Sequence, residues 1–143
     1  MIVTALAAFG CAHEAPEPAP PFKPVTTVRE LMESVIAHSA EVYWGSVQVT
    51  VDATGEHEKK PQTDEEWEQV WAAALTLAES GNLLMLPPRA VDNGAWMQFA
   101  RSLIEAGAEA SAAAQAHDVE RVFAAGEQVY NACAGCHARY VLR

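Results

Sequence analysis

The sequence contains few basic residues. Nine Lys and Arg stand against nineteen Asp and Glu in 143 residues, which gives a formal net charge of −10. Proteins that bind nucleic acid need Lys and Arg to contact the phosphates, so this composition excludes nucleic acid as an expected partner. An acidic surface favours association with a basic partner protein, or serves only to keep the protein in solution.

Residues typical of β-strands are also scarce. They are mostly confined to the short stretch 47–51, whereas Ala, Leu, Glu and Gln recur throughout the chain. This composition predicts a mainly α-helical protein, and the length corresponds to one domain. The sequence shows no acid/base pair and no nucleophile constellation, so we do not expect an enzyme.

A membrane-spanning run is missing from the N-terminal region. Residues 2–10 are small or apolar, but so short a run cannot cross the ~30 Å of a bilayer's hydrocarbon core. The run ends at Cys11 and resembles the end of a bacterial lipoprotein signal, which predicts an export signal over 1–11 and a lipid anchor at Cys11. Because no Lys or Arg precedes the run, a simple cleaved or truncated export signal stays open. Both interpretations predict a periplasmic protein, membrane-anchored in the first case.

Proline is concentrated in one segment. Five of the eight prolines lie within 12–24, a density typical of a stiff, extended tether without a core of its own. The folded domain is therefore expected over 25–143.

Four segments of that domain show the apolar spacing of amphipathic helices. Thr27 with Glu30, and Thr63 with Glu66, have the spacing of capping boxes, and Asp118 is a third candidate N-cap. Short links between most of the segments predict an all-α, up-down-up-down antiparallel four-helix bundle. The predicted helices cover about 27–44, 63–86, 93–114 and 118–140.

The connection between the first two helices is longer. Residues 47–51 alternate apolar and polar side chains, which predicts an extended piece too short to form a sheet alone. Residues 52–55 form a turn signal, and the charged segment 56–62 is expected to be a loop.

Only three cysteines occur, and two of them lie in the motif Cys133-Ala-Gly-Cys136-His137. Positions i, i+3 and i+4 of a helix project from one face, here the apolar face of the last helix. Two thiols at this spacing can add to the two vinyl groups of haem, and the adjacent His can ligate its iron. The motif therefore predicts one covalently bound haem c, with Cys133 and Cys136 as thioethers and His137 as the proximal ligand.

Two other interpretations of the cysteine pair were weighed. A structural zinc site needs four ligands, and the sequence offers no second pair at suitable spacing. A thioredoxin-type redox pair belongs at the N-terminus of a helix after a strand, whereas Cys133 and Cys136 lie near the end of a helical segment.

Together these features resemble the cytochrome c′ family over roughly residues 25–143. The resemblance rests on four amphipathic helices, the haem motif in the last of them, and the aromatic Tyr140 that follows it. It implies a four-helix bundle with haem attached to the C-terminal helix, Tyr140 beside the haem, and a homodimer. A basic residue after the aromatic is common in the family, but Val141 stands there, so Arg139 or Arg143 would have to meet a propionate.

The resemblance also concerns the distal side of the iron. Arg29-Glu30-Leu31-Met32 resembles the low-spin branch of the family, in which a Met of the first helix ligates the iron, so Met32 is the predicted distal ligand. The alternative is that Met32 only fills the core. Weaker candidate ligands are Met85, Met97, His38, His57 and His117.

The favoured function is electron transfer by Fe(II)/Fe(III) cycling with a redox partner protein that has a basic docking surface. If Met32 does not ligate, binding of nitric oxide or carbon monoxide becomes the better interpretation. Peroxide chemistry would need a distal His or Arg, for which Arg29 is the candidate. The long connection 45–62 either covers the haem edge or forms a partner surface. Trp44, Trp67, Trp71 and Trp96 are expected in the core or between helices.

Overall fold

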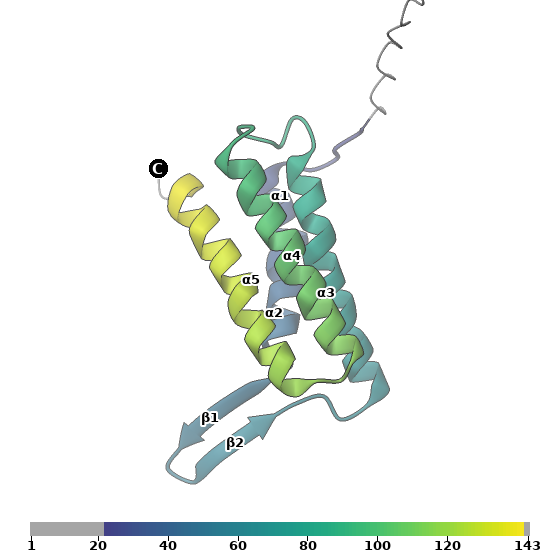
Figure 1. The fold of residues 1–143 in the computed structure, drawn as a ribbon, viewed down its shortest axis with the longest axis vertical. Helices are drawn as coiled ribbons and strands as arrows, with labels where there is room; N and C mark the ends of the chain where they lie inside the picture. Colours follow the sequence, from purple (N-terminus) through teal and green to yellow (C-terminus); the bar gives the residue numbers. More distant parts are fainter. Residues whose placement is uncertain (1–21, 142–143) are drawn as a thin grey trace, which may run out of the picture.

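The computed structural model describes residues 22–141. The predicted signal over 1–11, with Cys11, and most of the predicted tether over 12–24 lie outside the described residues, as does Arg143. The prediction of a mainly helical protein is confirmed for the part described (Figure 1). The helical elements are α1 (Val28–Leu31), the π-helical turn η1 (Met32–Ile36), α2 (Ala37–Trp44), α3 (Asp64–Met85), α4 (Ala95–Gln115) and α5 (Val119–Tyr140).

Three predicted helix starts are confirmed by their hydrogen bonds, whereas α4 begins at Ala95 without a side-chain cap. The Glu30 amide donates to Thr27 Oγ1 over 3.2 Å, and the Thr27 amide donates to the Glu30 carboxylate over 2.8 Å. Thr63 and Glu66 form the same reciprocal pair at the start of α3. Asp118 caps α5 by accepting a hydrogen bond from the Arg121 amide. Each cap satisfies amides that have no partner within their own helix.

The connection between α2 and α3 contains a hairpin that the sequence analysis did not predict. β1 (Gln48–Asp52) pairs antiparallel with β2 (Gly55–Lys59), with Val49 opposite Glu58 and Asp52 opposite Gly55. The expectation of a charged loop over 56–62 was therefore wrong for 56–59, whereas the predicted turn at 52–55 is confirmed. Gly55, with φ of 129°, takes a conformation that a side chain disfavours. Figure 1 shows the hairpin projecting from the end of the molecule where α5 begins.

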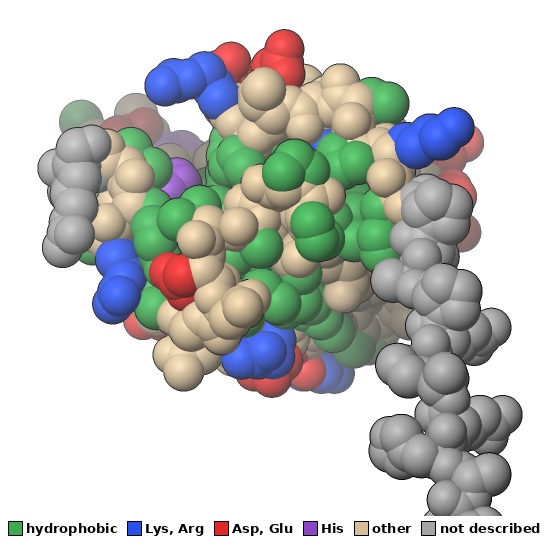
Figure 2. Space-filling view, turned by 90° about the horizontal axis from the view of Figure 1, so that it is seen from above, with side chains coloured by type: hydrophobic (Ala, Val, Ile, Leu, Met, Phe, Trp, Pro, Cys, Tyr) green, Lys and Arg blue, Asp and Glu red, His purple; other side chains and the backbone are tan. Residues whose placement is uncertain are grey.

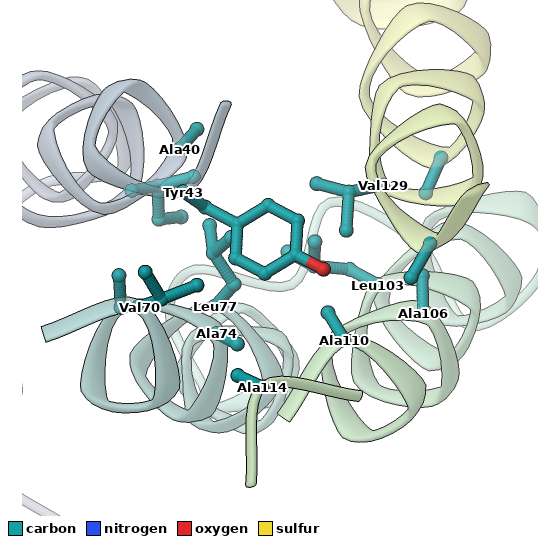
Figure 3. Close-up of a cluster of buried hydrophobic side chains, with 14 of the residues drawn as sticks. Ala40, Tyr43, Val70, Ala74, Leu77, Leu103, Ala106, Ala110, Ala114 and Val129 are labelled. Atoms are coloured by element: carbon teal, nitrogen blue, oxygen red, sulfur yellow. The ribbon is translucent and has the colours of Figure 1, made fainter. Parts of the chain in front are cut away.

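The core lies between the four long helical segments and centres on Tyr43. Figure 3 shows its ring reaching from α2 into the space between α3, α4 and α5, and the side chain is 1% exposed. Its hydroxyl donates to the Val122 carbonyl over 2.9 Å, which supplies the partner that a buried hydroxyl needs. Burial raises the pKa of Tyr43 well above its ordinary value, with a smaller contribution from Glu109.

Small residues allow α3 and α4 to approach each other closely. A Cβ added to Gly107 would lie 2.5 Å from the Ala78 amide nitrogen, and one added to Gly81 would lie 2.6 Å from the Ala100 carbonyl oxygen. α3 continues unbroken through Gly81, so this glycine serves close packing and does not end the helix.

At the end of the molecule where α5 finishes, apolar side chains gather in the middle of the surface, with charged groups around them (Figure 2). Arg89, in the connection after α3, is buried there. Its guanidinium donates to the carbonyl and hydroxyl oxygens of Thr26 and to the Leu83 carbonyl. These bonds tie the chain that enters α1 to the end of α3.

Candidate functional site

The Cys-Ala-Gly-Cys-His motif lies in the last third of α5. Cys133 and Cys136 are half-buried free thiols, and His137 is exposed beside them. The prediction that all three project from the buried face is therefore only partly met, because His137 lies at its margin. The three side chains nevertheless contribute to one cavity.

This cavity has a volume of about 450 Å³, within the range of small-molecule and cofactor sites. It lies where the C-terminal half of α5 faces the first helical segment and α4. Figure 1 shows α5 leaning away from α4 towards this end. The lining is mostly apolar and comprises Met32, Ile36, Ala37, Ala40, Glu41, Trp44, Leu84, Trp96, Phe99, Ala100, Leu103, Tyr130, Ala132, Cys133, Ala134, Cys136 and His137.

Met32 lies on the first helical segment and lines the same cavity as the motif. It is the first residue of η1, and its carbonyl accepts a hydrogen bond from the Ala37 amide five residues later. Residues five apart in an α-helix point about 140° away from each other. The wider π-helical turn allows Met32 and Ala37 to line one cavity, and turns of this kind are frequent at functional sites.

α4 supplies two of the aromatic side chains of the lining, Trp96 and Phe99. The Trp96 indole nitrogen donates to the Leu84 carbonyl over 2.8 Å, which fixes the ring. Phe99 packs so closely on the motif that a Cβ added to Gly135 would lie 2.9 Å from its ring. The glycine inside the motif therefore allows α5 to approach the Phe99 ring.

Tyr140 is not among the residues that line the cavity, but it packs against two of them. Its ring packs edge-on against Trp96, with centroids 5.1 Å apart, and against Phe99. Its hydroxyl donates to Asp92 Oδ2 over 2.5 Å. The other oxygen of Asp92 accepts from the amides of Gly94 and Trp96. Tyr140 thus positions the end of α5 against the start of α4.

The Tyr140–Asp92 contact predicts a pH-dependent loss of stability in Tyr140→Phe. The hydrogen bond from the Tyr140 hydroxyl is the main cause of the lowered pKa of the Asp92 carboxyl. A lowered folded-state pKa contributes stability above the ordinary Asp pKa of about 3.9, and this contribution is lost as pH falls through the lowered value. The variant should therefore unfold at lower urea concentration than the parent at pH 7, and the difference should shrink at pH 3. Tyr130→Phe, on an exposed side chain, is the control; an equal loss at both pH values would contradict the prediction.

Both thiols of the motif are partly shielded from water. Burial raises the pKa of Cys133 and of Cys136, whereas redox-active pairs need a lowered thiol pKa. Within residues 22–141, no group of three or more His, Cys, Asp or Glu side chains lies together as a metal site, so four zinc ligands are not assembled there.

The weaker candidate ligands do not line the cavity. Met85 and Met97 are half-buried elsewhere, and His38 and His57 are exposed. His117 stacks on Trp67 with ring centroids 4.7 Å apart. Arg29 is exposed, lies 3.8 Å from the Glu33 carboxylate and does not line the cavity, so the peroxide interpretation has no support from its position.

Sequence analysis also missed parts of the lining. Phe99 and Leu103 belong to the apolar face predicted for the third helix, and that pattern alone does not reveal which of its members line a cavity. Of the four Trp residues, Trp67 and Trp96 are buried and Trp71 is half-buried, as expected. Trp44 is 36% exposed, at the cavity margin.

No family model matches the chain, and no curated protein or solved structure does so. Among the helices of residues 22–141, none has the combined length and apolar character needed to cross a membrane.

Proposed function

We propose that this protein is a periplasmic c-type cytochrome that carries one covalent haem c and transfers electrons to or from a basic partner protein. One observation carries the proposal: a single apolar cavity is lined by both thiols of the motif, by His137 and by Met32 from the opposite helix. The proposed fold is an up-down-up-down antiparallel four-helix bundle of the cytochrome c′ type, with haem on α5. An export signal over 1–11 and a tether over 12–24 would precede it, with a lipid anchor at Cys11.

The residues of the cavity suit a haem group. A porphyrin is a flat, mostly apolar molecule, and the side chains of Ile36, Leu103 and Phe99 offer it apolar surface. Soft sulfur and imidazole nitrogen are both found as axial ligands of haem iron. His137 lines the cavity and is exposed, so the cavity reaches the surface of the protein at this residue.

Each residue then has a separate task. Cys133 and Cys136 would hold the group to α5 through thioether bonds, and His137 would offer the proximal nitrogen. Met32 would offer the distal sulfur from the helical segment that the Thr27–Glu30 cap begins and that Arg89 ties to α3. When bound, the haem supplies a reversible one-electron centre whose reduced state thioether ligation favours. The aromatic side chains of α4 exclude water from the inner side of the cavity.

The absorption spectrum of the full chain, matured with a c-type haem attachment system, tests this function. We expect a low-spin spectrum in both redox states, reversible reduction, and no change of the reduced spectrum under carbon monoxide. Haem should remain with the chain after denaturation, because thioether bonds survive it. A chain that emerges without haem would contradict the proposal.

The alternative is a five-coordinate haem protein that binds nitric oxide or carbon monoxide. It is favoured by the small side chains of Ala37 and Ala40, which leave space next to Met32 on the same side of the cavity. This alternative requires that the Met32 sulfur does not ligate the iron. A high-spin parent spectrum that shifts with carbon monoxide would establish this alternative in place of electron transfer.

A further inference from the structure

A second hollow, which we call the groove, adjoins the candidate haem cavity. It has a volume of about 600 Å³ and lies between strand β1 and the seam of α2 with α5. Trp44 and Tyr130 line both this groove and the cavity. The Trp44 indole donates to the Gly126 carbonyl over 3.0 Å, and its ring meets that of Tyr130 edge-on at 6.4 Å. These two aromatic side chains therefore separate the cavity from the surface groove.

The groove is bordered by apolar side chains that the fold leaves in water. Phe123 and Tyr130 are 61% and 60% exposed, and Val49 of β1 is 50% exposed. With Trp44 they form one surface, which we call the aromatic face: Trp44, Val49, Phe123 and Tyr130. Contiguous exposed apolar surface with polar residues around it marks a site of protein association.

The charges around the aromatic face are predominantly acidic. Among the described residues that line the cavity and the groove, the charged ones are Glu41 and Glu127. Val49 and Phe123 also line an adjoining hollow with Glu58, Glu120, Lys59 and Lys60, so four carboxylates stand against two Lys in the three hollows together. A second copy of this chain, with its net charge of −10, would bring like charges together, and anionic lipid would do the same. A partner with basic residues around an apolar centre would complement the face.

We propose that the aromatic face with Glu41 and Glu127 is the docking surface for a basic redox protein, an inference that rests on the proposed electron-transfer function. Docking here places the partner next to the cavity, with Trp44 and Tyr130 between the two. The hairpin does not line the cavity, so the long connection 45–62 forms part of a partner surface rather than a cover. The glutamates steer the encounter, and the apolar side chains bind after contact.

The test measures binding of a basic mitochondrial-type cytochrome c, used as the probe, to the isotopically labelled, haem-loaded full chain. Resonances of Trp44, Phe123 and Tyr130 should shift on titration, and affinity should fall as salt rises. Glu41→Lys with Glu127→Lys should weaken binding by about tenfold or more, equivalent to roughly 1.4 kcal/mol. Glu68→Lys with Glu79→Lys, exposed on α3, changes the net charge equally and should weaken it far less.

A second variant separates the electrostatic attraction of the partner from the apolar contacts made after it has bound. Phe123→Ser keeps every charge and should weaken binding at high salt as well as at low salt. The inference is overturned if both charge variants weaken binding equally, if the shifts map to α3, or if sedimentation shows that the chain self-associates through this face. The spectrum of the same sample reports haem loading separately. Binding at the aromatic face by a chain without haem would therefore reject the proposed function and still support the surface.

Discussion

Replacing Met32 by alanine is expected to convert the haem-loaded protein from low-spin to high-spin and to make its reduced form sensitive to carbon monoxide. Met32 lines the cavity on the helical segment that faces His137, and it is the methionine among the described residues that does so. Alanine cannot supply a sulfur, so the distal position becomes open to an added ligand. The reduction potential should fall as well, because thioether ligation raises it.

The change of spin state in Met32→Ala must be distinguished from the effect of a general loss of core packing. Met85 and Met97 are half-buried like Met32 but do not line the cavity, so Met85→Ala and Met97→Ala remove the same atoms from the core. Loss of buried methylene groups costs up to about 2–5 kcal/mol at fully buried sites and less at half-buried ones. We expect all three variants to lower stability and only Met32→Ala to change the spin state. An unchanged spectrum in Met32→Ala would reject Met32 as the ligand.

Local hydrogen-bond patterns explain which parts of the fold the sequence could predict. The capping pairs at Thr27 and Thr63 satisfy amides within four residues of themselves, so their spacing is sufficient evidence for a helix start. The prediction for Asp118 succeeds for the same reason. The helix spacing of Cys133 and His137 likewise depends only on one turn of one helix.

Pairing between distant residues explains what was missed. Strand β2 reads Gly-Glu-His-Glu-Lys and is exposed at every position, so it shows none of the alternation that identifies a half-buried strand. It is a strand because the turn before it brings Glu58 opposite Val49. The π-helical turn at Met32 also has no sequence signature, although it determines which side chains of that helix share the cavity.

Helix periodicity proved too coarse for the outer surface of α5. An apolar stripe about 100° wide has residues at its edges that are buried only if a neighbouring helix reaches over them. The sequence does not show how far the neighbouring helix reaches. Phe123 and Tyr130 lie at the edge of the stripe and face outward, whereas Val122 and Val129 beside them are buried. Trp44, expected in the core or between helices, lies between α2 and α5, but it is also 36% exposed. The aromatic face was not predicted for the same reason.

Replacing both Cys133 and Cys136 by alanine is expected to abolish covalent haem attachment. Both half-buried thiols line the cavity, and each can form one thioether bond. The single variants should retain one bond each, whereas the double variant should lose all its haem on denaturation. Denaturing electrophoresis with haem staining, together with the intact mass, measures the result directly.

Cys11 provides the matched control, because it is the remaining thiol of the chain. Cys11→Ala should carry haem as fully as the parent, since the motif alone is responsible for attachment. The intact mass of the parent also tests the predicted lipid at Cys11, which the variant should remove. If the double variant kept covalent haem, attachment would have to involve Cys11, and the cavity between α5 and Met32 would lose its assigned role. If only the double variant lost covalent haem, the two half-buried thiols of α5 would be the points of attachment. The apolar cavity beside them would then be the place where the haem lies.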